Sequence, residues 1–108
     1  MIHCGTGEEC RPSRFEEFFK KYPDANVILA HSNPALETLE MLKKYKNVKC
    51  DIACSKTDNI QTVLNSDFKN KVLFGTDFPV THYFDTHLFG KNISLKDEYM
   101  KNCKEFFT

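Results

Sequence analysis

The strongest constraint on the fold is a regular alternation of short apolar runs with segments of helical periodicity. The aliphatic cores of four runs begin at Ile2, Val27, Val48 and Val72, which is one every 21 to 25 residues. Runs of this length and composition predict strands. Strands that recur with helices between them predict βαβ units, a parallel sheet and right-handed crossovers, and hence an α/β fold. The expected strands cover residues 1–4, 26–31, 47–52 and 71–77.

The segments between these runs have the spacing of amphipathic helices. The first expected helix begins at Pro12 and ends before Pro23. Four aromatic side chains recur on it at helical spacing and are expected to form one buried face: Phe15, Phe18, Phe19 and Tyr22. The second helix is expected to have Asn33 as its N-cap. The third and fourth are expected over 58–65 and 94–106.

Length and composition limit the domain organisation and the class of partner. With 108 residues, of which 41% are hydrophobic, the chain has room for one globular domain. Its 15 basic and 15 acidic residues give zero net charge, which argues against nucleic acid or an anionic membrane as a partner. No apolar run is long enough to span a bilayer and no secretory leader is recognisable. We therefore expect a cytoplasmic protein whose five cysteines are free thiols.

Polar residues occur at the carboxyl end of each expected strand. They are His3, His31, Asp51 and Asp77. Ligands of parallel α/β sheets bind beyond these ends. Alternation along a strand places these side chains opposite apolar neighbours, for example His31 opposite Ile28 and Ala30. If those neighbours pack against helices, the polar groups face one common region, where imidazole and carboxylate would suit a divalent metal. Asp51 is the weaker candidate, and we expect it to support a histidine from outside the metal's ligands.

One long segment without a strand or helix signal, 80–93, contains several aromatic residues and two further histidines. A segment of this length in a compact domain is typically a binding or covering loop. His82 and His87 are therefore candidates for a substrate loop.

Four strings at the strand ends resemble successive strand ends of the amidohydrolase superfamily. They are Ile-His-Cys-Gly at 2–5, Ile-Leu-Ala-His-Ser-Asn at 28–33, Asn-Val-Lys-Cys-Asp at 47–51 and Leu-Phe-Gly-Thr-Asp-Phe-Pro at 73–79. The last string is the most specific. The most similar branch is that of the amidohydrolase-related metal-dependent hydrolases, which includes non-oxidative decarboxylases. The resemblance implies a distorted (β/α)8 barrel of the TIM type, with these strands as the fifth to the eighth.

The resemblance also implies roles for the strand-end residues. His3 would be a metal ligand, and His31 either a ligand of a second metal or a proton relay. Asp77 would bind metal and take a proton from the attacking water, so that Asp77 and His31 are the catalytic candidates. The expected cofactor is a divalent metal, with zinc preferred. The expected substrate is a small molecule of carboxylate or amide type, and the expected reaction is hydrolysis, with the related non-oxidative decarboxylation as the alternative.

The chain departs from the family pattern in what it lacks. The His-x-His pair of the family's first strand and the ligand of its fourth strand are both missing. A complete barrel needs about 200–250 residues. We therefore expect residues 1–108 to form a single partial domain, the C-terminal half of a barrel, which is inactive alone. Its open sheet edges would allow self-association, which would repeat this half-site rather than complete it.

Two other hypotheses remain open. One is a thiolate site, formed by Cys50 with Cys54 or by Cys4 with Cys10, although neither spacing matches the usual zinc or redox motifs. The other is a complete small α/β binding module that has no catalytic activity and needs no metal.

Overall fold

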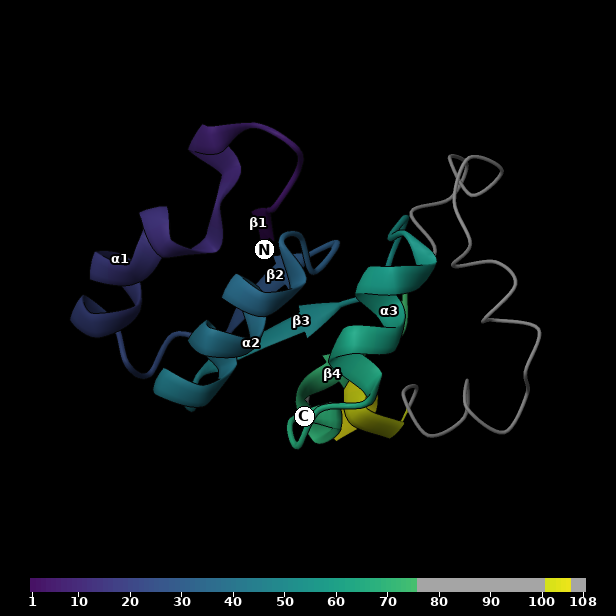
Figure 1. The fold of residues 1–108 in the computed structure, drawn as a ribbon. Coiled ribbons are helices and arrows are strands. Elements are labelled where there is room, and N and C mark those ends of the chain that lie inside the picture. The colour runs from purple at the N-terminus through teal and green to yellow at the C-terminus, as the bar shows by residue number, and fades with distance from the viewer. Residues whose placement is uncertain (76–100, 106–108) are drawn as a thin grey trace.

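The structure is a computed structural model that describes residues 1–75 and 101–105. Its centre is a parallel sheet in which the strands are neighbours in chain order (Figure 1). His3 pairs with Ala30, Leu29 with Cys50, and Asp51 with Leu73. The predicted α/β class is therefore confirmed, and each strand lies within its expected run, although the fourth strand ends at Leu73, short of the expected end at residue 77. The strands are β1 (Ile2–His3), β2 (Val27–Ala30), β3 (Val48–Asp51) and β4 (Val72–Leu73).

Helical segments connect each strand to the next. Two short 3-10 helices and α1 connect β1 to β2, α2 connects β2 to β3, and α3 with a third 3-10 helix connects β3 to β4 (Figure 1). Residues 101–105 are also helical, whereas the rest of the fourth expected helix lies outside the described residues. The bounds are η1 (Glu8–Cys10), η2 (Pro12–Phe15), α1 (Glu16–Lys21), α2 (Ala35–Lys44), α3 (Thr57–Leu64) and η3 (Lys69–Lys71).

One hydrophobic cluster joins the sheet to the helices. It contains Phe19 of α1, Leu42 of α2 and Val63 of α3 together with alternate strand residues such as Leu29 and Cys50. The helices therefore cover one face of the sheet. Strands in simple chain order with helices on one face follow the progression of a barrel, whereas a doubly wound sheet reverses its strand order. The fold is consistent with part of a (β/α)8 barrel.

The first helix differs from its prediction. It begins at Pro12 as a 3-10 helix and becomes α-helical only at Glu16. Phe19 is fully buried, but Phe18 is 45% and Tyr22 46% exposed, so the expectation of one buried aromatic face is wrong. The reason is geometric: a 3-10 turn has three residues rather than 3.6, and the six-residue α1 is too short to carry a continuous stripe.

The predicted N-cap of the second helix is also wrong. Pro34, not Asn33, precedes the first residue of α2, and no side chain caps that end. The Asn33 amide instead donates a hydrogen bond to the Gly5 carbonyl at 2.7 Å. Asn33 therefore joins the segment after β2 to the segment after β1.

The facing of β2 differs from expectation as well. Val27 and Leu29 belong to the cluster shared with the helices, whereas Ile28 and Ala30 do not. His31 nevertheless lies near His3 because His31 and Ser32 have φ of 75° and 50°, which ends the strand alternation at Ala30. On β1 and β3 the predicted facing is confirmed, since Cys4 and Cys50 belong to the cluster and His3 and Asp51 do not.

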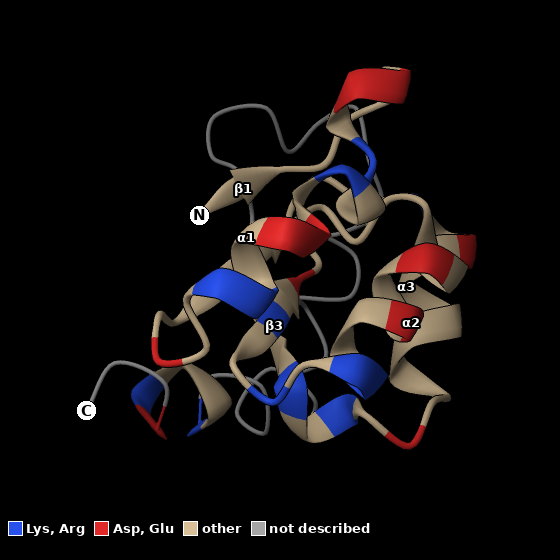
Figure 2. Ribbon diagram, turned by 90° about the vertical axis from the view of Figure 1, so that its left-hand side faces the viewer, with Lys and Arg blue, Asp and Glu red and all other residues tan. Residues whose placement is uncertain are grey.

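Charge and apolar surface follow the helices. Acidic residues occupy the first turns of α1 and α2 and lysines their last turns, which complements the helix dipoles (Figure 2).

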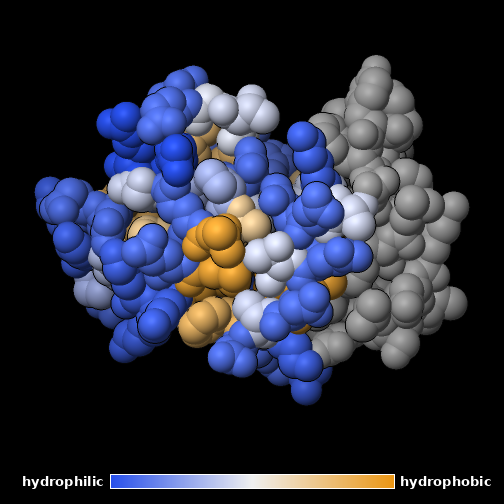
Figure 3. All heavy atoms as spheres, viewed as in Figure 1, coloured by the Kyte–Doolittle hydropathy of each residue, from blue (hydrophilic) through white to orange (hydrophobic). Residues whose placement is uncertain are grey.

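Figure 3 shows a mostly hydrophilic face with a small apolar patch over α2. Leu36 of that helix is 76% exposed. Within the described ranges, no helix is long and apolar enough to cross a membrane.

Candidate functional site

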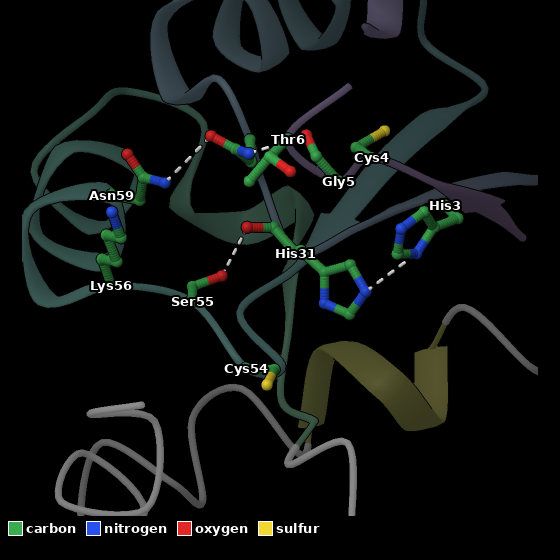
Figure 4. Close-up of a pocket in the computed structure, with 10 residues that line it drawn as sticks. His3, Cys4, Gly5, Thr6, His31, Cys54, Ser55, Lys56 and Asn59 are labelled. Carbon is green, nitrogen blue, oxygen red and sulfur yellow. Dashed lines mark hydrogen bonds between the residues drawn. The ribbon is translucent and has the colours of Figure 1, made fainter. Parts of the chain in front are cut away.

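Two histidines meet at the carboxyl end of the sheet. His3 is the last residue of β1, and His31 follows the last residue of β2. His3 Nδ1 lies 3.2 Å from His31 Nε2, and the two rings are edge to face (Figure 4). The pair comes from positions 28 residues apart in the chain, and the parallel register of β1 and β2 brings them together.

The backbone of His31 is fixed by groups from the segment around β3. Asp51 Oδ1 accepts the His31 N–H at 2.9 Å and the Ala53 N–H at 3.1 Å. The Ser55 hydroxyl donates to the His31 carbonyl. These bonds hold His31 in a left-handed conformation that a non-glycine residue rarely adopts. Asp51 is thus a positioning residue that acts on the His31 main chain.

A carbonyl oxygen determines the tautomer of His31. His31 Nδ1 lies 2.6 Å from the Ala53 carbonyl oxygen. Because a carbonyl only accepts hydrogen bonds, Nδ1 carries the proton, and Nε2 of the neutral ring keeps its lone pair. That lone pair is directed towards His3. His31 Nε2 can therefore accept a proton from His3 or bind a cation.

The absence of a side chain at Gly5 leaves room for the His3 ring. A Cβ on Gly5 would lie 2.5 Å from His3 Nε2, much closer than van der Waals contact allows. Any larger residue at position 5 would displace the ring or the loop.

Two hollows flank the histidine pair. One, of about 460 Å³, is lined also by Asn33, Lys56 and Asn59. The other, of about 480 Å³, lies on the side of Asp51 and Phe74. His3 and His31 line both, so groups bound in either hollow can reach the pair.

The remaining predicted site residues are not brought to this pair by the described structure. Asp77, His82 and His87 lie outside the described residues. Within residues 1–75 and 101–105, no group of three or more His, Cys, Asp or Glu side chains is arranged to hold a metal ion. The described part of the chain therefore supplies two imidazole nitrogens.

Two of the cysteines, Cys4 and Cys50, have the properties of buried apolar residues. All five are free thiols. Burial raises the pKa of Cys4 and of Cys50 to about 12. Both therefore remain protonated near neutral pH, whereas metal binding and nucleophilic attack need the thiolate. This argues against the thiolate-site hypothesis at these two positions.

Sequence reasoning named Asp51 as a supporting residue but missed the other groups that position the pair. Gly5 and Ser55 are far apart in the sequence, so no single spacing connects both of them to the histidines. The Ala53 carbonyl belongs to the main chain and has no sequence signal at all. Only Gly5, two residues after His3, carried a signal, because a glycine just beyond a strand often marks a close backbone approach.

The fold and the histidine pair together indicate the class of protein. A parallel sheet in chain order, helices on one face and two imidazoles at the carboxyl ends of neighbouring strands are the features of a (β/α)-type domain with a polar site beyond its strand ends. Residues 1–101 match the family model described as amidohydrolase. The chain belongs to the amidohydrolase family. No curated protein and no solved structure gives a significant match to it.

Proposed function

We propose that this chain supplies the C-terminal half of a metal-dependent hydrolase site, with His3, His31 and Asp77 as ligands of a divalent cation. The family relationship supports a hydrolase. The observation that carries the proposal is the 3.2 Å separation of His3 Nδ1 and His31 Nε2. Zinc is the proposed metal, and a small carboxylate- or amide-type molecule is the proposed substrate.

The donor set fits such a cation. Two nitrogens bound to one tetrahedral zinc, each at 2.0–2.1 Å, are separated by about 3.3–3.4 Å. The observed pair is within about 0.2 Å of this value. The second ring nitrogen of His31 is bonded to a backbone carbonyl, which is the usual way in which a protein orients a metal-binding imidazole.

The chain's own residues would divide the chemistry between them. When bound, a zinc-type ion supplies Lewis acidity, which polarises a carbonyl and makes water acidic near neutral pH. His3 and His31 would hold the ion, and Asp51 would keep His31 in place through its main chain. Asp77 follows β4 in sequence, and its carboxylate is proposed to take the proton of the attacking water.

Metal titration of the full chain tests the proposal. Co²⁺ and Zn²⁺ affinities are measured by competition with a chelating dye for the native chain and for His3→Ala, His31→Ala and Asp77→Asn. We expect one ion per chain, and a loss of affinity of at least about tenfold in each variant, or 1.4 kcal/mol. His82→Ala and His87→Ala are the matched controls and should leave the affinity unchanged.

The Co²⁺ spectrum separates this proposal from the thiolate hypothesis. Binding through imidazole and carboxylate gives no sulfur-to-cobalt charge-transfer band. Such a band, or affinities that do not change in the His3 and His31 variants, would overturn the proposal.

Within the described residues, β1 and β4 each pair with one neighbour only. Unpaired strand edges favour association, so self-association of this chain through β1 or β4 is proposed, and sedimentation at increasing protein concentration would measure it.

A further inference from the structure

The hollow beside the histidine pair has an unusual charge balance. Its described lining contains one formally charged side chain, Lys56, and no carboxylate. The other polar side chains are two amides, two hydroxyls, two thiols and the two histidines. A concave site of about 460 Å³ is large enough for a small organic molecule. Its charge favours an anionic molecule over a neutral or cationic one.

Lys56 is held at the wall by the start of α3. It is the residue that precedes the helix, and its carbonyl accepts the N–H of Ile60 at 3.0 Å. In the described part of the chain its ammonium group has no ion-pair partner, unlike Lys20 and Lys44. The ammonium group is therefore available to a ligand of opposite charge.

A neighbouring amide is oriented by a short hydrogen-bond chain. Asn59 donates to Asn33 Oδ1 at 3.4 Å, and Asn33 donates to the Gly5 carbonyl at 2.7 Å. An asparagine amide has two N–H donors, so Asn59 keeps one more for a ligand. Figure 4 shows Lys56 and Asn59 together on one side of the hollow, with His31 between them and His3.

We propose that Lys56 and Asn59 form a carboxylate-binding subsite that determines the substrate class of the site at His3 and His31. One carboxylate oxygen would accept from the Lys56 ammonium and the other from the Asn59 amide. The rest of the molecule would extend towards the histidines. This inference rests on the proposed hydrolase function for its biological meaning, but the anion subsite itself requires no metal.

Nuclear magnetic resonance titration of the full chain, freed of metal with EDTA and then desalted, tests the subsite. The probes are malonate and malonamide, its neutral counterpart of nearly the same shape. Malonate is expected to shift the Asn59 side-chain amide and the Gly5 amide, with affinity that falls as salt is added. Malonamide is expected to bind at least about fivefold more weakly.

Matched lysine variants assign the effect. Lys56→Gln should weaken malonate binding about fivefold or more, and Lys56→Arg should restore most of it. Lys43→Gln removes the same charge from an exposed position in the last turn of α2 and should leave the binding unchanged. Equal binding of malonate and malonamide, or equal weakening by Lys56→Gln and Lys43→Gln, would overturn the subsite.

Different results would overturn the metal-site proposal and the carboxylate-subsite proposal. Zinc binding that depends on His3 and His31, combined with malonate binding that is independent of Lys56, overturns the subsite alone. Lys56-dependent malonate binding by a chain that binds no zinc supports the subsite and contradicts the hydrolase proposal.

Discussion

At the scale of single residues, the site depends on groups that never touch a substrate. His31 has a φ of 75°, a conformation that costs an L-residue of order 1–2 kcal/mol. The bonds from Asp51 and Ser55 offset that cost. The geometry of the imidazole is therefore set by the end of β3 and by the segment that follows it.

Replacement of Asp51 should expose this dependence. Asp51→Ala leaves the His31 and Ala53 N–H groups without their acceptor, and we expect the free energy of unfolding to fall by about 2–3 kcal/mol. Asp51→Asn keeps an oxygen acceptor and should cost less. Urea unfolding of the three proteins measures the difference. A loss below about 0.5 kcal/mol in Asp51→Ala would contradict the role given to this carboxylate.

Gly5 offers a second test at this scale. Gly5→Ala places a methyl group against His3 Nε2 and should rotate or displace the ring. Zinc affinity should then fall about tenfold or more, as for other changes that disorient a ligand. Gly7→Ala is the control, since a Cβ there meets only the end of the flexible Glu9 side chain. Equal affinities for both variants would show that the His3 ring needs no such space.

At the scale of elements, a lysine from the segment before β4 stabilises the end of α2. Lys71 Nζ donates to the carbonyls of Leu42 at 2.7 Å and Tyr45 at 3.0 Å, which no helical N–H satisfies. Burial, with a smaller contribution from Lys49, lowers the pKa of Lys71. The contact attaches the end of α2 to η3, directly before β4.

Removal of that ammonium group should loosen α2. Lys71→Met is expected to lower the free energy of unfolding by about 1–2 kcal/mol, because two carbonyls lose a charged donor. Lys69→Met changes an exposed lysine two residues earlier and should be nearly neutral. Thermal unfolding of both variants provides the comparison. Similar melting temperatures of Lys71→Met and Lys69→Met would show that the Lys71 ammonium group does not stabilise the end of α2.

A carboxylate in the first turn of α2 should make stability depend on pH. Burial alone would raise the pKa of Glu37, but hydrogen bonds from the Ser13 N–H and the Arg11 guanidinium, each 2.8 Å long, hold it below its ordinary value of 4.5. A lowered folded-state pKa means that Glu37 stabilises the fold above about pH 4.5. This contribution is lost as the pH falls through the folded-state pKa. Glu37→Gln should therefore flatten the acid side of the stability profile, measured by urea unfolding from about pH 6 to about pH 3. An unchanged slope would contradict this linkage.

Elements were predictable from sequence where one local signal dominated. Every strand begins where its aliphatic run begins, at Ile2, Val27, Val48 and Val72, one residue after the expected start of each strand. Phe18 and Tyr22 were misplaced because a 3-10 segment shifted the helix phase, and Asn33 because a distant carbonyl competed for its side chain. The approach of His3 to His31 followed from strand ends, but the left-handed turn that aims His31 depends on tertiary bonds that no local pattern encodes.

At the scale of the whole molecule, strand order connects the fold to the site. Strands in chain order with helices on one face place successive carboxyl ends side by side, so that residues from β1 and β2 meet although they are far apart in sequence. In the described residues this brings the imidazole nitrogens of His3 and His31 together beside the hollow that Lys56 lines. The central claim is that the two nitrogens act as a pair towards one cation.

Nitrogen-15 resonances of the histidine rings during a Zn²⁺ titration test that claim most directly. We predict that His3 Nδ1 and His31 Nε2 shift together, with one common midpoint, while His31 Nδ1 remains protonated against the Ala53 carbonyl. Shifts of the two nitrogens with different midpoints, or shifts at His82 and His87 alone, would contradict it.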